Sequence, residues 1–210
     1  MVNFKFKKMK KFLILVISVL FLSIGHLYAQ EQGKFRVGLD LGYTIPTSGG
    51  GGLLFYLEPK YNIRDNMNIG LRIGGAAMVR DLVYFDNMNE LSGNISVNGS
   101  YVLTYDYYFK SEGSNFAPFV GAGIGWMRFA AISFDSDVEP DEAGNLSVNS
   151  SFAPVLRAGF EAGKFRLSLD YNIVPKSDIV DLQGNVIGET GNSYLGIALG
   201  FYVGGGKWRN

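Results

Sequence analysis

The sequence predicts an all-β fold, an eight-stranded antiparallel up-and-down β-barrel, and two independent patterns predict it. The first is a strict alternation of apolar and polar residues, with a period of two, through eight segments of the chain. The second is an alternation of short and long connections between these segments. Together they describe a meander of strands whose two ends face different surroundings.

The first four strands are predicted from segments in which the apolar residues share one face. In the first segment, Leu39 and Leu41 share a face while Asp40 lies on the opposite one. The four apolar faces run from Phe35 to Ile45, from Leu53 to Ile63, from Met67 to Val79, and from Ile95 to Phe109.

The last four strands follow the same rule, and Gly is frequent on their second face. Gly121, Gly123 and Gly125, for example, alternate with larger apolar residues. The four apolar faces run from Pro118 to Trp126, from Leu156 to Ala162, from Phe165 to Ile173, and from Leu195 to Val203.

The connections between these strands differ in length according to the side on which they lie. Tight turns are predicted at 64–66, 110–115 and 163–164. Long loops are predicted at about 80–93, 131–144 and 176–192, and the Gly-rich first connection, 46–52, is intermediate. Short turns on one side and long loops on the other are typical of barrels that cross a membrane.

Residues 1–29 are predicted to be a secretory signal peptide. Five Lys residues precede an apolar stretch from Phe12 to Ile24, which is too short to span a bilayer as a helix. Cleavage is expected after Leu27-Tyr28-Ala29, leaving residues 30–210 as a single barrel domain. This barrel domain has 14 basic and 19 acidic residues, and its net charge of −5 disfavours a nucleic-acid partner.

The composition argues against several kinds of chemistry. The chain has no Cys, and its single His, His26, lies in the predicted signal peptide. A disulfide scaffold, a thiolate metal site and a cysteine nucleophile are therefore excluded, and imidazole catalysis is not expected in the exported chain. We predict no catalytic residues, no cofactor and no enzymatic activity.

The apolar face of the barrel is expected to point outward. An eight-stranded barrel has an interior that side chains just fill, so it could not hold about a dozen aromatic residues. With the polar face inside, the many Gly residues leave room for large inward side chains such as Arg72 and Arg157. The alternative is a soluble, secreted, lipocalin-like barrel that binds a ligand on an inward apolar face.

Aromatic residues at the strand ends support the outward orientation. Membrane barrels carry aromatic girdles where the apolar band meets the lipid headgroups. The residues expected at the lipid interface are Tyr43, Phe55, Tyr61, Tyr107, Trp126 and Tyr171.

With these features, the chain resembles the small outer-membrane β-barrel proteins of Gram-negative bacteria, the OmpA and OmpX type. The segment from Pro118 to Gly125 is similar to strands of that family, and Gly196, Leu199 and Phe201 resemble its assembly signal, although here Tyr202 to Asn210 follow. The resemblance implies a location in the cell outer membrane. It also implies outer-membrane lipid, lipopolysaccharide and the outer-membrane assembly machinery as partners. We expect a monomer.

The polar face predicts a network of ion pairs that plugs the lumen. Five acids and four bases nearly balance, and an unpaired buried charge is strongly destabilising. The alternative is a narrow conducting pathway lined by the same charges. The predicted network consists of Asp40, Glu58, Lys60, Arg72, Asp106, Arg157, Glu161, Arg166 and Asp170.

One loop is dense in carboxylates, which are ligands that Ca²⁺ prefers. Its candidate ligands are Asp135, Asp137, Glu139, Asp141 and Glu142. Counted from Asp135, the sixth position is Pro140 instead of the Gly of a helix–loop–helix calcium site. A solvated acidic loop is the competing interpretation, and the sequence favours it.

For function, the sequence favours a surface protein that acts in adhesion, envelope structure or partner binding through its long loops. Binding residues commonly lie on loops that a rigid scaffold positions. The alternatives are a narrow, porin-like transport barrel for small or apolar solutes, and the soluble ligand-binding barrel described above.

Overall fold

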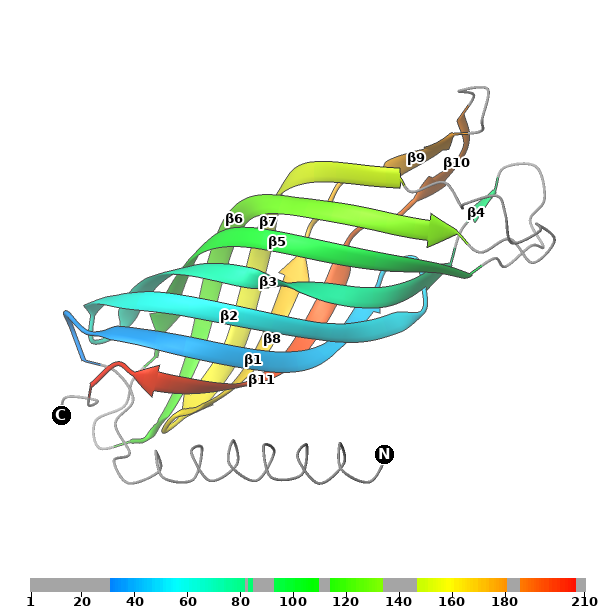
Figure 1. Cartoon of the computed structure of the whole chain (residues 1–210). Coiled ribbons are helices and arrows are strands. Elements are labelled where there is room, and N and C mark those ends of the chain that lie inside the picture. The colour runs from blue at the N-terminus through cyan, green and yellow to red at the C-terminus, as the bar shows by residue number, and fades with distance from the viewer. Residues whose placement is uncertain are drawn as a thin grey trace, which may run out of the picture.

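The computed structural model describes residues 31–81, 83–84, 93–109, 114–133, 147–180 and 186–206 of the chain. Eight long strands form the wall of a barrel, and three short strands lie beyond one of its ends (Figure 1). Within these ranges, no helix has the length and apolar character needed to cross a bilayer. The predicted signal peptide, residues 1–29, lies outside the described residues.

The strands are numbered in chain order. The barrel strands are β1 (Phe35–Pro46), β2 (Gly51–Arg64), β3 (Met67–Asp81), β5 (Gly93–Tyr108), β6 (Phe116–Ser133), β7 (Ser147–Ala162), β8 (Phe165–Asn172) and β11 (Tyr194–Gly204). The short strands are β4 (Val83–Tyr84), β9 (Ser177–Val180) and β10 (Val186–Thr190).

The barrel is closed and every neighbouring pair of its strands is antiparallel, in the order β1-β11-β8-β7-β6-β5-β3-β2. The first and last strands close the wall, because β1 pairs with β11 from Arg36↔Gly204 to Pro46↔Tyr194. Closure leaves no sheet edge with unpaired N–H and C=O groups. The hydrocarbon core cannot hydrogen-bond such groups, so strands that cross a bilayer must form a closed barrel. The predicted fold is confirmed.

The apolar face points outward, as the sequence predicts. Leu39 is 47% exposed and Ile124 is 46% exposed, whereas Asp40, next to Leu39, is 1% exposed. In water this arrangement would expose a continuous apolar band around the wall, and in a bilayer the lipid tails cover it. The soluble, lipocalin-like alternative is therefore wrong, because its apolar side chains would line the interior.

Glycines on the inward face make room for the buried charges. Gly200 of β11 pairs with Asp40 of β1, and a Cβ added at Gly200 would lie 1.7 Å from Oδ1 of Asp40. A Cβ at Gly121 would lie 2.2 Å from Oδ1 of Asp106. The alternation of Gly with large side chains is thus what lets an eight-stranded barrel enclose so many long polar groups.

Aromatic residues gather at both ends of the wall. Rings on neighbouring strands pair near the tight turns, with centroids 4.9 Å apart for Phe116 and Phe160 and 5.5 Å apart for Phe165 and Phe201. Near the long loops, the rings of Trp126 and Phe152 lie 6.3 Å apart. The outer surface therefore has an aromatic girdle at each end, as membrane barrels do.

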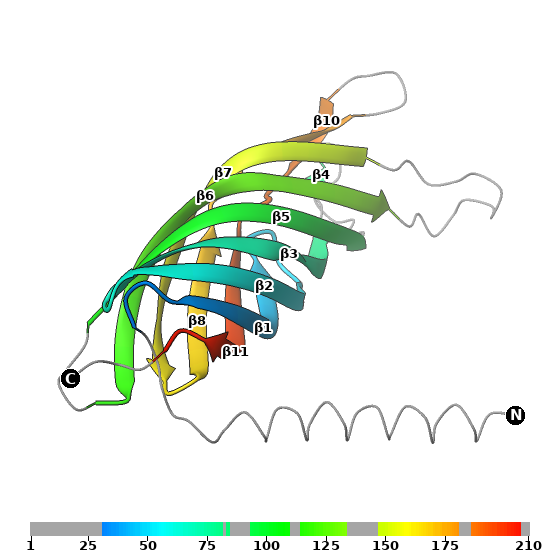
Figure 2. The ribbon, with the colours of Figure 1, turned by 60° about the vertical axis from the view of Figure 1, so that its left-hand side comes forward.

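A small second sheet lies beyond the loop-side end of the barrel and was not predicted. Its order is β4-β10-β9, so it joins the connection after β3 to the connection after β8 (Figures 1 and 2). Sequence analysis treated 80–93 and 176–192 as loops, because strands of two to five residues are too short to show a clear alternation.

Candidate functional site

The lumen holds the densest collection of polar chemistry in the described structure. All nine predicted charged residues have buried side chains that point inward, and Arg36 joins them. The lumen network, as we call this set, has five acids and five bases: Arg36, Asp40, Glu58, Lys60, Arg72, Asp106, Arg157, Glu161, Arg166 and Asp170.

Glu58 of β2 lies at the centre of the lumen network. Arg157 of β7 donates from Nη1 and Nη2 to its two carboxylate oxygens, at 2.6 and 3.1 Å. Arg166 of β8 donates at 2.9 Å, and the Thr104 hydroxyl donates at 2.7 Å. Lys60 Nζ is 3.3 Å from the same carboxylate. One side chain thus links strands that lie on opposite sides of the barrel.

Two further carboxylates extend the network around Arg157. Asp170 accepts a hydrogen bond from Arg157 Nε at 2.9 Å and lies 3.4 Å from Arg72 Nη1. Asp106 accepts a hydrogen bond from Lys60 and lies 3.5 Å from Arg157 Nη1. Each base in this part of the lumen therefore faces at least one carboxylate, which is what keeps buried charges tolerable.

A separate cluster closes the lumen near the tight turns. Arg36 donates a bidentate pair of hydrogen bonds to the Glu161 carboxylate, with N···O distances of 2.8 and 3.0 Å. The Tyr108 hydroxyl donates to the same carboxylate at 2.7 Å, and the ring of Tyr202 lies 4.3 Å from the guanidinium carbon of Arg36. The alternation of the first predicted strand puts Arg36 on the same face as Asp40, but the predicted network did not include Arg36.

Asp40 is the least satisfied member of the lumen network. It is 1% exposed, and within the described structure its Oδ1 accepts no hydrogen bond. Its carboxylate occupies the space that a side chain at Gly200 of β11 would need, as described above. Asp40 is therefore positioned by closure of the barrel more than by an ion pair of its own.

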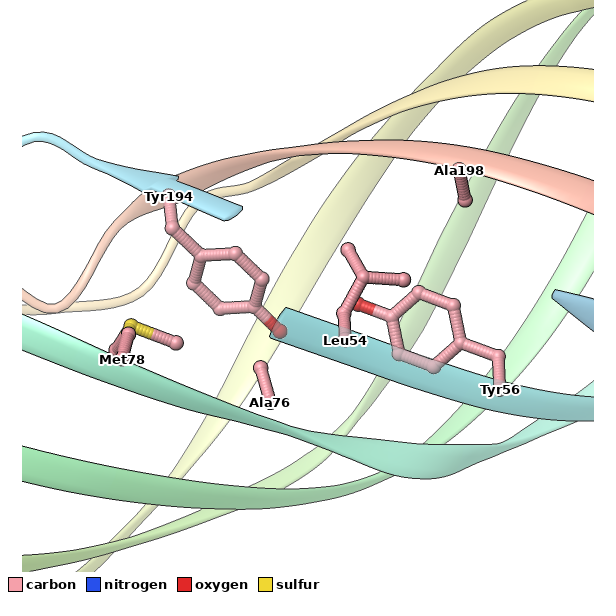
Figure 3. Close-up of a cluster of buried hydrophobic side chains, with 6 residues drawn as sticks. All are labelled: Leu54, Tyr56, Ala76, Met78, Tyr194 and Ala198. Atoms are coloured by element: carbon pink, nitrogen blue, oxygen red, sulfur yellow. The ribbon is translucent and has the colours of Figure 1, made fainter. Parts of the chain in front are cut away.

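Two apolar clusters lie in the loop-side half of the lumen, beside buried neutral polar side chains such as Ser96 and Asn98, and most of their members were not predicted from the sequence. One cluster is Leu54, Tyr56, Ala76, Met78, Tyr194 and Ala198, drawn in Figure 3. A second is Val102, Met127, Phe129, Ala153, Val155 and Val174. Alternation alone could not reveal these clusters, because both faces of the strands are apolar at these positions. Among the described side chains, the buried charges thus lie in the centre and turn-side half of the lumen, and the loop-side half holds apolar and neutral polar groups.

Lys164 lies in the turn between β7 and β8, outside the membrane-spanning segments. Its amino group donates to the carbonyl oxygen of Gly204. Partial burial, followed by the positive charge of Arg36, lowers the pKa of Lys164 below its usual value. The turn-side rim therefore carries less positive charge at high pH than an exposed lysine would give.

The remaining predicted residues fall outside the lumen. Five of the interface aromatics have exposed side chains and Tyr107 is half-buried; the five are Tyr43, Phe55, Tyr61, Trp126 and Tyr171. The carboxylates of the predicted calcium loop, Asp135 to Glu142, lie outside the described residues. Among the described residues, no group of three or more His, Cys, Asp and Glu side chains could hold a metal ion.

A closed antiparallel barrel with an apolar exterior, two aromatic girdles and a charged lumen defines a class. The chain is a small outer-membrane β-barrel protein of the Gram-negative type, and it resides in the outer membrane.

Comparisons with known proteins agree with this class. The chain is 25% identical to outer membrane protein W of Escherichia coli (strain K12) over 163 residues, which cover 73% of this chain and 76% of that protein. It is 24% identical to outer membrane protein W of Vibrio cholerae over 156 residues, 62% of this chain and 70% of that protein. The structure of OprG from Pseudomonas aeruginosa has the same fold, with a TM-score of 0.54, 13% identity, and coverage of 83% of this chain and 98% of OprG. No family model matches the chain.

Proposed function

We propose that this protein is a non-conducting outer-membrane barrel that binds an external surface or partner through its loop-side end. The observation that carries the proposal is the lumen network, in which ion pairs tie β2 to β7 and β8 across the interior. Opening an aqueous path would require these directly hydrogen-bonded pairs to separate. The barrel then serves as a rigid base for its loops.

The small sheet outside the barrel supports a role for the loops. It joins two connections that are far apart in the sequence, since β4 follows β3 whereas β9 and β10 precede β11. Backbone pairing, such as Glu189↔Val83, holds these connections together. Loops held on a rigid scaffold are the usual place for binding residues.

Conductance measurements test the sealed lumen. The purified, folded protein in planar bilayers is expected to give no sustained single-channel currents. A Glu58→Ala/Arg157→Ala variant, which removes the central contacts between β2 and β7, is the matched comparison and is expected to give small currents. Sustained currents from the unmodified protein would contradict the proposal.

Removal of the β9–β10 hairpin tests the loops. Residues 177–190 are replaced by a short Gly-Ser linker, and retention of expressing cells is measured on surfaces coated with polysaccharide or with protein. We expect the variant to lose the retention that the unmodified protein confers while remaining a folded barrel. Equal retention of cells with and without the protein would argue against adhesion.

We also propose that the protein is not an enzyme. The only His in the chain is His26, and Cys is absent, so a nucleophile paired with imidazole is not available in residues 30–210. Incubation with labelled lipopolysaccharide tests this, and the acyl chains are expected to be recovered unchanged.

A second candidate function is the uptake of small apolar solutes, and the two loop-side clusters in the lumen favour it. Leu54, Met78 and Phe129 offer an apolar surface there instead of further charges. Beside them, the pairing of β7 with β8 ends at Val155↔Asn172, followed by one hydrogen bond from the Ile173 N–H to the Pro154 carbonyl oxygen, although β7 continues to Ser147. A solute would enter the loop-side half of the lumen from the cell exterior. It would leave sideways into the membrane, because the lumen network blocks the path toward the tight turns.

Uptake is tested with a labelled apolar solute and cells that express the protein. Met78→Asp would place a charge among the apolar side chains, and we expect it to abolish uptake without creating conductance. The exposed substitution Val79→Asp, on the other face of β3, is the matched control for the added charge. Uptake that is unchanged by Met78→Asp would exclude the loop-side lumen as the route.

A further inference from the structure

One cation stands out on the outer surface of the barrel. Between the aromatic girdle near the tight turns and the loops, Arg128 of β6 is the single charged residue among the described outward-facing side chains. No described carboxylate lies within ion-pair distance of Arg128. Ionisable residues on a lipid-facing surface are rare, and in general they mark a functional position.

The depth of Arg128 places it at the level of lipid headgroups. It follows Trp126 by two residues toward the loops, which at the rise and tilt of a barrel strand corresponds to about 5 Å. Trp126 belongs to the loop-side girdle, and such rings lie where acyl chains meet headgroups. Long loops face the cell exterior in outer-membrane barrels, so this position belongs to the outer leaflet.

The neighbours of Arg128 leave space around its guanidinium. In register, Arg128 pairs with Gly99 of β5 and Ser150 of β7. A Cβ added at Gly99 would meet nothing within 4 Å, so the surface is open on that side. The small flanking residues Gly99 and Ser150 thus leave the wall beside Arg128 open to a ligand.

An aromatic surface borders this open position on the membrane side. Tyr101, Trp126 and Phe152 lie side by side on β5, β6 and β7, and all three are exposed. Three adjacent strands span about 10 Å, which is wide enough for more than one acyl chain. The surface therefore suits a lipid that carries several acyl chains below a negatively charged headgroup.

We propose that Arg128, with its open flank at Gly99 and the aromatic surface formed by Tyr101, Trp126 and Phe152, binds a phosphate group of lipopolysaccharide in the outer leaflet. The planar guanidinium can donate two parallel hydrogen bonds to phosphate oxygens. The phosphate supplies the negative charge that the described side chains around Arg128 do not. The acyl chains of the same lipid lie against the three rings.

Lipid binding by the folded protein in a zwitterionic detergent tests the proposal. The probes are diphosphoryl lipid A, the same lipid A without its phosphates, and phosphatidylglycerol. We expect diphosphoryl lipid A to bind about tenfold more tightly than the dephosphorylated form, a preference of the size that one charge-assisted contact gives. Arg128→Gln is expected to abolish this preference. Arg64→Gln, at the exposed arginine of the tight-turn rim, is expected to retain it.

A second variant blocks the site while keeping the positive charge of Arg128. Gly99→Phe fills the open flank without a clash within the protein, and we expect it to reduce binding of diphosphoryl lipid A to the level of Arg128→Gln. Migration on SDS gels before and after boiling verifies that each variant is folded. Equal binding of lipid A with and without phosphate, unchanged binding by Arg128→Gln, or equally tight binding of phosphatidylglycerol would each overturn the proposal.

Discussion

At the scale of single residues, the buried charges matter through their pairing. Arg36 and Glu161 are both shielded from solvent, and each is satisfied chiefly by the other and by Tyr108. Replacing one of them leaves an uncompensated charge in the interior, whereas replacing both leaves no unpaired buried charge. The two cases have different consequences for stability.

Arg36→Met is expected to lower the free energy of unfolding by about 3–5 kcal/mol, because Glu161 loses its partner. Arg36→Met/Glu161→Gln is expected to lower it by less, since no buried charge is then left unpaired. Urea unfolding in lipid vesicles measures both. Glu161→Gln alone completes the cycle, and a double variant whose loss equals the sum of the Arg36→Met and Glu161→Gln losses would show that the residues do not interact.

Leu39 tests the outward face. Leu39→Arg places a charge about midway between the two girdles and is expected to cost about 2–4 kcal/mol of unfolding free energy. Val203→Arg, on an exposed residue near the end of β11, is expected to cost only about 0–1 kcal/mol. Equal losses in the same unfolding assay would contradict the depth that the structure gives to Leu39.

At the scale of elements, closure of β1 on β11 depends on a fit between opposing residues. Gly200→Ala would place a methyl group against the carboxylate of Asp40, and overpacking of this kind costs about 1–3 kcal/mol. Asp40→Ala in the same chain should recover most of this loss, because Oδ1 of Asp40 accepts no hydrogen bond from the described residues. Gly99→Ala, on the open outer face, is the control and is expected to change stability very little. The urea midpoints of refolding are compared for Gly200→Ala, Gly200→Ala/Asp40→Ala and Gly99→Ala.

The elements also show where sequence reasoning succeeds and where it fails. Alternation around Leu39 and Asp40 predicts the strands and their inward charges, because one face meets lipid and the other does not. It does not predict the inward positions of Leu54 and Met78, where apolar residues occupy both faces. It also misses β9 and β10, whose lengths are too short to show a period.

Arg128 was missed for a different reason. The alternation of the fifth predicted strand was followed only to Trp126, although β6 continues to Ser133. The charge breaks the apolar face at the point where the wall leaves the hydrocarbon core. Its significance depends on the register with Gly99 and Ser150, which belong to other strands and cannot be read from its own segment.

At the scale of the whole molecule, a closed wall resists unfolding in detergent. The unboiled protein is expected to migrate faster on SDS gels than the boiled protein, because SDS does not open a complete set of strand pairings. The same gel applied to the outer-membrane fraction tests folding and location together. Identical migration before and after boiling would contradict a closed barrel.

The long sequence separation of the buried pairs has a kinetic consequence. Arg36 and Glu161 are 125 positions apart, and Arg166 and Glu58 are 108 apart, so their contacts form only after most of the chain is in place. A partly assembled wall would expose these ions to hydrocarbon, which makes halfway states unfavourable intermediates. Insertion is therefore expected to proceed as one concerted event, with late neutralisation of the interior as its committing step.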